Sequence, residues 1–207
     1  ILGAGVIGVT TAYFLNKRGH DVMVIDREPE SAMECSFANG GQLSYSHAEP
    51  WANPGMLWKA VKWLGKKDAP LLLRPNLDPH MWAWTGKFLR NCTKEKAHYN
   101  TRNILRLDLY SRAVMHDLVK ELPMQFNYRQ NGKLHLYKVQ KDFDGGRGQA
   151  EFQETLGDTH EFLTPDQCVE KEPALAHIHP DLVGGIFAPG EESGDIHKFA
   201  LALTQHE

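Results

Sequence analysis

The sequence opens with three glycines whose spacing restricts how the chain can fold. Residues 1–26 read ILGAGVIGVTTAYFLNKRGHDVMVID: an apolar strand end, Gly3-x-Gly5-x-x-Gly8, a helical pattern, and a second apolar strand over residues 22–25. In such a strand–turn–helix–strand unit, Gly3 permits the tight turn, Gly5 leaves the backbone open to a pyrophosphate, and Gly8 lets the helix approach the strands. The unit predicts an α/β nucleotide-binding domain with a doubly wound parallel sheet.

Neighbouring residues agree with this interpretation. Gly19 stands where a helix C-cap glycine is expected. Asp26 ends the second strand, where a carboxylate can accept hydrogen bonds from ribose hydroxyls. The helix N-terminus would offer unpaired N–H groups and a partial positive charge to phosphates. The alternative is a glycine-rich turn in an unrelated α/β domain.

A second pair of glycines follows in residues 35–43, which read CSFANGGQL. Gly40 and Gly41 stand next to Asn39 and close to Ser36, so the backbone can form a nest with hydroxyl and amide donors. Such a loop could lie against a phosphate or a flavin ring. A plain connecting loop is the alternative.

Composition narrows the class of protein. The 207 residues suffice for one large or two small domains, and a net charge of −3 argues against a dedicated nucleic-acid binder. Three widely spaced cysteines without CxxC spacing indicate reduced thiols in a cytosolic protein. His177-x-His179 is expected to be a surface pair, not a metal site. The sequence contains no GxxxxGK[ST], HExxH or GxSxG motif, so its chemistry is expected to come from a bound cofactor.

The opening fingerprint, read through Asp26, resembles that of FAD-binding amine and amino-acid oxidoreductases of the D-amino-acid oxidase class. Within that class, residues 36–42 look like the second flavin-contact loop of the family of bacterial D-amino acid dehydrogenase small subunits. Further stretches that resemble this family are residues 50–55, 74–82, 89–92 and 194–199. Many of these flavoproteins carry glutamate where this chain has Asp26, and either carboxylate can hold a ribose.

The resemblance implies FAD as the cofactor and oxidation of a D-amino acid, with D-alanine as the expected substrate, to a 2-oxo acid and ammonia. It also implies hydride transfer to flavin N5, electron transfer to a respiratory-chain acceptor other than oxygen, and a cytoplasmic location with peripheral contact to the inner membrane. No catalytic or metal-binding residue is predicted. The expected cofactor-binding residues are Ile1, Leu2, Gly3, Ala4, Gly5, Val6, Ile7, Gly8, Asp26, Arg27, Ser36, Asn39, Gly40, Gly41 and Gln42.

Three alternatives remain open at this point. The glycine fingerprint alone would also fit an NAD-dependent dehydrogenase. A sister flavin amine oxidase acting on glycine or sarcosine would share the resemblance. A non-catalytic module that senses a flavin or dinucleotide would need the same cofactor loops without the chemistry.

The order of the predicted elements divides the chain into two domains, the first of which is formed by both ends of the chain. Residues 1–45 are expected to begin the FAD-binding domain, residues 46–189 to form a mixed α+β substrate domain around an antiparallel sheet, and residues 190–207 to return to the first domain. Because the chain starts inside a strand and stops inside a helical pattern, it is expected to be the N-terminal part of a longer protein. This arrangement leaves the first domain incomplete.

Local patterns predict the elements of the second region. Leu107, Tyr110, Val114 and Leu118 recur at helical spacing, which predicts a helix over 94–122 with these residues on its buried face. Asn131-Gly132 predicts a hairpin that joins two flanking strands. An amphipathic basic helix over 56–67 is expected to pack on its own domain, with a membrane interface as the alternative. The remaining expectations are strands at 126–130, 133–137, 160–163 and 182–188, helices at 149–156, from 165 and from 196, and an irregular connector at 69–79.

The glycine turn yields a first prediction. In the Gly5→Val variant, the side chain would occupy the space that a pyrophosphate needs, so the FAD content of the purified protein should collapse while the second region stays folded. Visible absorption measures the flavin, and circular dichroism measures the fold. Normal FAD stoichiometry in the variant would contradict the placement, and a colourless parent protein that binds NADH would favour the nicotinamide alternative.

Overall fold

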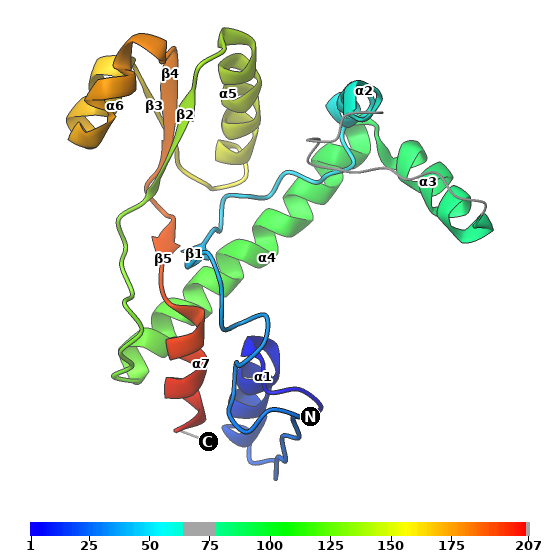
Figure 1. The fold of residues 1–207 in the computed structure, drawn as a ribbon, viewed down its shortest axis with the longest axis vertical. Helices are drawn as coiled ribbons and strands as arrows, with labels where there is room; N and C mark the ends of the chain where they lie inside the picture. The colour runs from blue at the N-terminus through cyan, green and yellow to red at the C-terminus, as the bar shows by residue number, and fades with distance from the viewer. Residues whose placement is uncertain (64–77, 206–207) are drawn as a thin grey trace.

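The computed structural model describes residues 1–63 and 78–205, which form a mixed α/β structure. The longest element is helix α4 (Lys94–Glu121), which runs obliquely across the molecule in Figure 1. Helices α2 (Pro54–Trp63) and α3 (Pro79–Asn91) lie at one end of α4.

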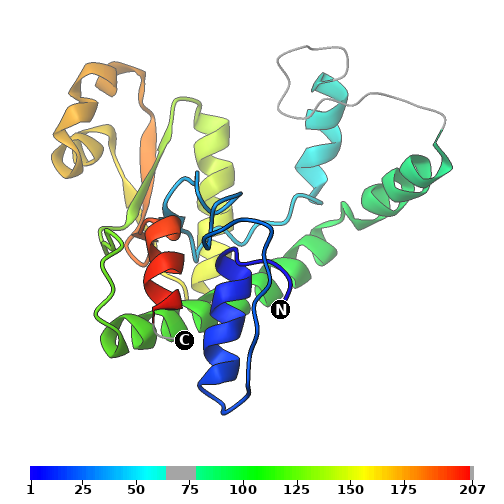
Figure 2. The same cartoon turned by 60° about the horizontal axis from the view of Figure 1, so that its bottom comes forward.

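The N-terminal unit lies near the other end of α4. Helix α1 (Val6–Asn16) packs beside α7 (Ile196–Thr204), as Figure 2 shows. Leu2 and Ile25 form a parallel bridge, and Gly3 N donates to the Ile25 carbonyl over 2.8 Å. This confirms that the two expected apolar stretches run parallel beside each other. The core that joins α1, α4 and α7 consists of Ala4, Val9, Tyr13, Leu118, Phe126, Phe199 and Leu203.

Helix α4 has the bounds that the sequence predicts, but not the expected buried face. Its N-cap is Thr93, whose side chain accepts from the backbone of Lys96. Leu118 is buried, whereas Leu107 and Tyr110 are 66% and 67% exposed. Leu107 shares a helical face with Leu118 but lies about three turns away from it, and α1 and α7 cover only the C-terminal end of α4. The expectation that Leu107 and Tyr110 face the core was therefore wrong.

A three-stranded antiparallel sheet forms the second unit, as expected. Its strands are β2 (Lys133–Tyr137), β3 (Glu161–Leu163) and β4 (Gly184–Ala188), in the order β2-β4-β3. Helix α5 (Gln140–Glu154) covers one face and α6 (Pro165–Lys171) the other (Figure 1). The 3-10 helix η1 (Pro173–Asp181) leads from α6 to β4.

A short strand pair joins the two units. Strand β1 (Gln42–Leu43) pairs antiparallel with β5 (Glu192–Ser193), and Arg129 forms an isolated antiparallel bridge to Ser193. The chain thus passes from β4 through β5 directly into α7. This pair places the loop before β1 against the start of α7.

The expected hairpin at Asn131-Gly132 was wrong. Strand β2 pairs with β4, and Arg129 in the preceding segment bonds to Ser193 instead. Gly132 has a φ of 72°, and a β-carbon there would lie 2.3 Å from the Phe187 ring. Gly132 therefore allows the chain to pack closely against Phe187 of β4. Strand β2 pairs with the distant strand β4 in place of the predicted hairpin partner.

Helix α5 also differs from the expectation, because it begins at Gln140 and not at residue 149. Three glycines inside it lower its intrinsic helix propensity, but the ring of Phe143 packs against Tyr137 with centroids 5.5 Å apart. Packing on the sheet thus outweighs local propensity. Helix α2 confirms the described part of the expected helix over 56–67, and most of the expected connector lies outside the described residues.

Adjacent glycines in α5 give a matched prediction. A β-carbon on Gly146 would lie 2.3 Å from the Tyr137 hydroxyl, whereas one on Gly145 meets nothing within 4 Å. Gly145→Ala should raise the free energy of unfolding by up to about 1 kcal/mol through helix propensity. Gly146→Ala should lower it by about 1–3 kcal/mol through overpacking. Urea unfolding measures both, and equal effects would contradict the packing of α5 on β2.

Candidate functional site

The glycine turn has the geometry that its spacing predicts. Gly3 adopts a φ of 97°, which is unfavourable for residues with a β-carbon. A β-carbon on Gly8 would lie 1.8 Å from the Gly3 carbonyl oxygen, so the first turn of α1 rests directly on the strand end. Close helix packing therefore requires a glycine at position 8.

The N-terminus of α1 is free to receive an anion. Its N-cap residue, Gly5, has no side chain to accept from the first turn, and that turn carries no acidic residue. Val6 N donates to Ser36 Oγ over 3.2 Å. Helix N-termini with unpaired donors favour phosphate groups, and Ser36 adds a hydroxyl at the same place.

Asp26 faces the same turn from the second strand. Its Oδ2 accepts from Ala4 N over 2.5 Å and its Oδ1 from Glu28 N over 2.8 Å. These hydrogen bonds, chiefly the one from Ala4, hold the pKa of Asp26 below its usual value. The carboxylate is thus ionised at neutral pH. An ionised carboxylate offers about four acceptor sites, so two remain for a ligand.

A cleft of about 650 Å³ brings part of the predicted site together, within the range of small-molecule sites. Arg27 lies at its wall and donates through Nε to Glu34 over 2.6 Å. The predicted cofactor residues that line the cleft are Leu2, Gly3, Gly5, Asp26, Arg27 and Ser36. Segments 20 or more residues apart in the chain therefore meet at one place.

The rest of the second loop lines a neighbouring hollow of about 440 Å³, together with the start of α7. Asn39, Gly40 and Gly41 belong to it, and Asn39 Oδ1 accepts from Gly41 N over 2.8 Å. Gly194 N donates to the Gly41 carbonyl over 2.9 Å, which holds the loop against α7. The remaining predicted residues line neither space: Ile1, Ala4, Val6, Ile7 and Gly8 form the strand end and first helical turn, and Gln42 lies in β1.

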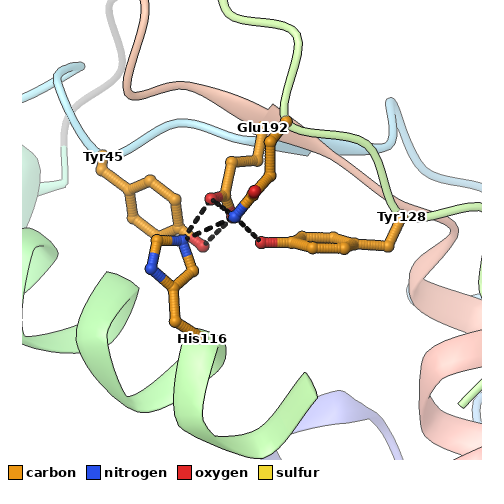
Figure 3. A network of polar contacts seen from close by, with 5 residues as sticks. Tyr45, His116, Tyr128 and Glu192 are labelled. Atoms are coloured by element: carbon orange, nitrogen blue, oxygen red, sulfur yellow. Dashed lines mark hydrogen bonds and ion pairs between the residues drawn. The ribbon is translucent and has the colours of Figure 1, made fainter. Parts of the chain in front are cut away.

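Sequence reasoning missed the carboxylate that anchors β5. Glu192 has a side chain only 3% exposed, and Figure 3 shows it among side chains from three other segments. Tyr45 Oη donates to Glu192 Oε2 over 3.1 Å, and Gln130 Nε2 donates to Oε1 over 3.1 Å. His116 Nε2 of α4 also bonds to Oε1. A buried carboxylate with these partners ties β5 to α4 and to the segment after β1.

The two tyrosines around Glu192 have raised pKa values, first because they are buried and second because the carboxylate lies beside them. Burial, followed by the negative charge of Glu192, raises the pKa of Tyr45 far above its usual value. Burial and a hydrogen bond to Glu192 raise the pKa of Tyr128 to about 12. Both phenols are therefore neutral at physiological pH and act as hydrogen-bonding groups, not as bases.

Glu191, the preceding residue, is a second buried carboxylate with a side chain 2% exposed. Its Oε1 accepts from Ser46 N over 2.6 Å and Ser46 Oγ over 2.7 Å, and its Oε2 lies 2.8 Å from Lys133 Nζ. Burial alone would raise the pKa of Glu191, but the bonds from Lys133 and Ser46 outweigh it and lower that pKa. Two adjacent acids after a buried strand were the available sequence signal.

Comparison with known proteins decides the family. The model of the family described as "FAD dependent oxidoreductase" matches residues 1–206. The chain belongs to this family. It is 46% identical over 205 residues to a D-amino acid dehydrogenase from Paramagnetospirillum magneticum, covering 99% of this chain and 49% of that protein. A D-amino acid dehydrogenase from Bradyrhizobium diazoefficiens is 44% identical, with 100% of this chain and 49% of that protein covered.

The chain thus spans about half the length of these relatives. Among solved structures, glycine oxidase from Geobacillus kaustophilus is similar with a TM-score of 0.67 at 20% identity, over 99% of this chain and 42% of that one. L-proline dehydrogenase from P. horikoshii is similar with a TM-score of 0.65 at 18% identity, over 99% and 40% of the two chains. These likenesses show a shared fold. The chain is therefore a homologue of D-amino acid dehydrogenases with about half of a family fold.

Within residues 1–63 and 78–205 no group of three or more His, Cys, Asp or Glu side chains is arranged to hold a metal ion. None of the helices in the same ranges combines the length and apolar character needed to cross a bilayer.

The Glu192 network gives a stability prediction. Glu192→Ala would leave the buried Tyr45 hydroxyl and the Gln130 amide without their acceptor, so the free energy of unfolding should fall by about 3 kcal/mol or more. Glu151→Ala removes an exposed i,i+4 partner of Arg147 and should cost under about 0.5 kcal/mol. Urea unfolding of both variants tests this, and similar small losses would show that Glu192 does not anchor β5.

Proposed function

We propose that the protein to which this chain belongs is an FAD-dependent D-amino acid dehydrogenase, with D-alanine as a substrate. The supporting observation is the cleft in which Gly5, Asp26 and Ser36 converge, in a chain 46% identical to a D-amino acid dehydrogenase. The family match favours a flavin over a nicotinamide cofactor. We also retain the proposed division into residues 1–45, 46–189 and 190–207, which the packing of α7 on α1 supports.

The residues of the cleft fit FAD. Ser36 Oγ, which accepts from Val6 N, would donate its own proton to a phosphate, and the open backbone at Gly5 leaves room for it. Asp26 has acceptor capacity left for ribose hydroxyls beyond its bonds to Ala4 and Glu28. The hollow beside Gly40 and Gly41 continues this surface toward α7.

Bound FAD would supply the oxidising chemistry by accepting the substrate Cα hydride, after which water converts the imino acid into a 2-oxo acid and ammonia. The contribution of the described residues is binding and orientation. The N-terminus of α1 would attract the phosphates, Asp26 would hold the ribose, and the pairing of β1 with β5 holds residues 39–42 against α7. No residue of the described ranges is assigned a proton-transfer role.

We further propose that the electrons pass to a respiratory-chain acceptor and that the protein is cytoplasmic, with peripheral contact to the inner membrane. This rests on the sequence resemblance to bacterial D-amino acid dehydrogenase small subunits. Reduction of a quinone analogue in preference to oxygen would agree with it. Rapid reoxidation of the reduced protein by oxygen alone would contradict it.

Anaerobic reduction of the flavin tests the proposed function. The full-length protein, purified with FAD, is mixed with D-alanine, L-alanine, glycine or sarcosine while visible absorption is recorded. We expect bleaching by D-alanine only. Selective bleaching by glycine or sarcosine would reassign the protein to a sister amine oxidase, and a bound flavin that none of them reduces would indicate a non-catalytic role.

The same preparation allows a matched test of the cleft. Asp26→Ala should weaken FAD binding by about one to two orders of magnitude, because a charge-assisted hydrogen bond to ribose is lost. Glu30→Ala, an exposed acid four residues away, should leave the dissociation constant unchanged. Equal FAD affinities in the two variants would show that the Asp26 carboxylate does not reach the ribose.

A further inference from the structure

A second cavity lies away from the glycine turn, between the sheet and α5, the two elements that stand side by side at the top of Figure 1. It has a volume of about 180 Å³ and is bounded by β2, β4, α5 and the segment that follows β1. The side chains of Lys133, His135 and Tyr137 point to it from alternate positions of β2. A volume of this size suits a small molecule and excludes a nucleotide.

Nitrogen atoms predominate among the polar groups of this cavity. Gln149 Nε2 and His160 Nδ1 are buried and have no hydrogen-bond partner among the described residues. The His160 side chain is 5% exposed; its Nε2 lies 3.5 Å from Asp158 Oδ2, and its Nδ1 lies 4.0 Å from Glu154 Oε1. Buried polar groups without partners are rare in folded proteins and call for an explanation.

Lys133 supplies a fixed positive charge at the cavity wall. Its Nζ donates to Ser44 Oγ over 2.8 Å and lies 2.8 Å from Glu191 Oε2. An ammonium group has three protons, so one remains for a ligand. Burial and the charge of Lys133 lower the pKa of His135, which is therefore neutral at physiological pH and available to donate one hydrogen bond.

These donors select the chemistry of the ligand. Among the described residues that line the cavity, Glu49 is the only acid, and its Oε1 already accepts from Asn53 over 2.9 Å. A cationic ligand would be repelled by the Lys133 ammonium, and an apolar ligand would leave the Gln149 amide without a hydrogen-bond partner. A carboxylate would accept hydrogen bonds from both Lys133 and Gln149.

We propose that this cavity is a second binding site, separate from the flavin cleft, for the carboxylate of a short 2-oxo acid or amino acid. Lys133 and Gln149 hold the carboxylate, and His135 and His160 contact the remaining polar group of the ligand. Because Lys133 also bonds to Ser44, one residue beyond β1, a bound ligand touches the segment that leads from the proposed flavin loop. The choice of probes rests on the proposed function, whereas the cavity and its donors do not.

Calorimetry and absorption together test the site in the full-length, FAD-loaded protein. Pyruvate and L-alanine, neither of which is expected to reduce the flavin, probe the two sources of the carboxylate under anaerobic conditions, and pyruvamide is the uncharged control. Binding near the flavin perturbs the visible spectrum, so a binding heat without spectral change reports the second cavity. We expect such a spectrally silent site for pyruvate or L-alanine and none for pyruvamide.

Variants on one helix provide the control. Gln149→Leu keeps the side-chain size and removes the buried donor, so the silent site should weaken by about tenfold or more. Gln140→Leu lies on α5 outside the cavity, where its amide bonds to Asp144, and should bind as the parent does. His135→Leu removes the ring nitrogens that border the cavity from β2 and should weaken binding.

The proposal fails if the parent shows no silent site, if Gln149→Leu and Gln140→Leu bind pyruvate equally, or if pyruvamide binds as tightly as pyruvate. These outcomes are independent of flavin reduction. A protein that binds pyruvate in the cavity but is not reduced by D-amino acids would retain this site and lose the proposed function. A protein that D-alanine reduces but that shows no silent site would keep the proposed function and lose the second binding site.

Discussion

The arrangement of the described residues depends on two adjacent carboxylates that the fold removes from water. Glu191 and Glu192 have side chains 2% and 3% exposed, and buried charges persist only where they are paired and hydrogen-bonded. Their partners come from α4, β2 and the segment after β1. Because all of these must be in place at once, β5 acts as the joint between the glycine turn region and the antiparallel sheet.

The hollow lined by residues 39–41 depends on this joint through the pairing of β1 with β5. The two-residue strand β1 is too short to be stable alone, and it carries residues 39–42 into position beside Gly194. The glycine turn, in contrast, is held locally by Gly3, Gly8 and the parallel contact between Leu2 and Ile25. One half of the candidate site is thus built by short-range geometry, and the other half by the buried acids.

The second cavity shares a wall with the same joint. Lys133 contacts Glu191 on one side and Ser44 on the other, so the lysine that would receive a carboxylate also supports the segment after β1. The cleft near the glycine turn is the proposed FAD site. The cavity under α5 has a different set of donors, and its functional interpretation rests on two buried atoms without hydrogen-bond partners, Gln149 Nε2 and His160 Nδ1.

The sequence alone determined the elements whose hydrogen bonds are local. The turn at Gly3 and the helix starts at Lys94, Pro165 and Ile196 follow from contacts within a few residues, and each is found where the pattern predicts it. Three predictions were wrong: a hairpin at Asn131-Gly132, a helix that begins only at residue 149, and the burial of Leu107 and Tyr110. In each case the outcome depends on a partner distant in sequence: β4 for β2, Tyr137 for α5, and the limited reach of α1 and α7 along α4. Only the tertiary structure could show that Glu191 and Glu192 are buried, because the free energy of burying a carboxylate depends on donors that the chain brings to it from 60 to 150 residues away.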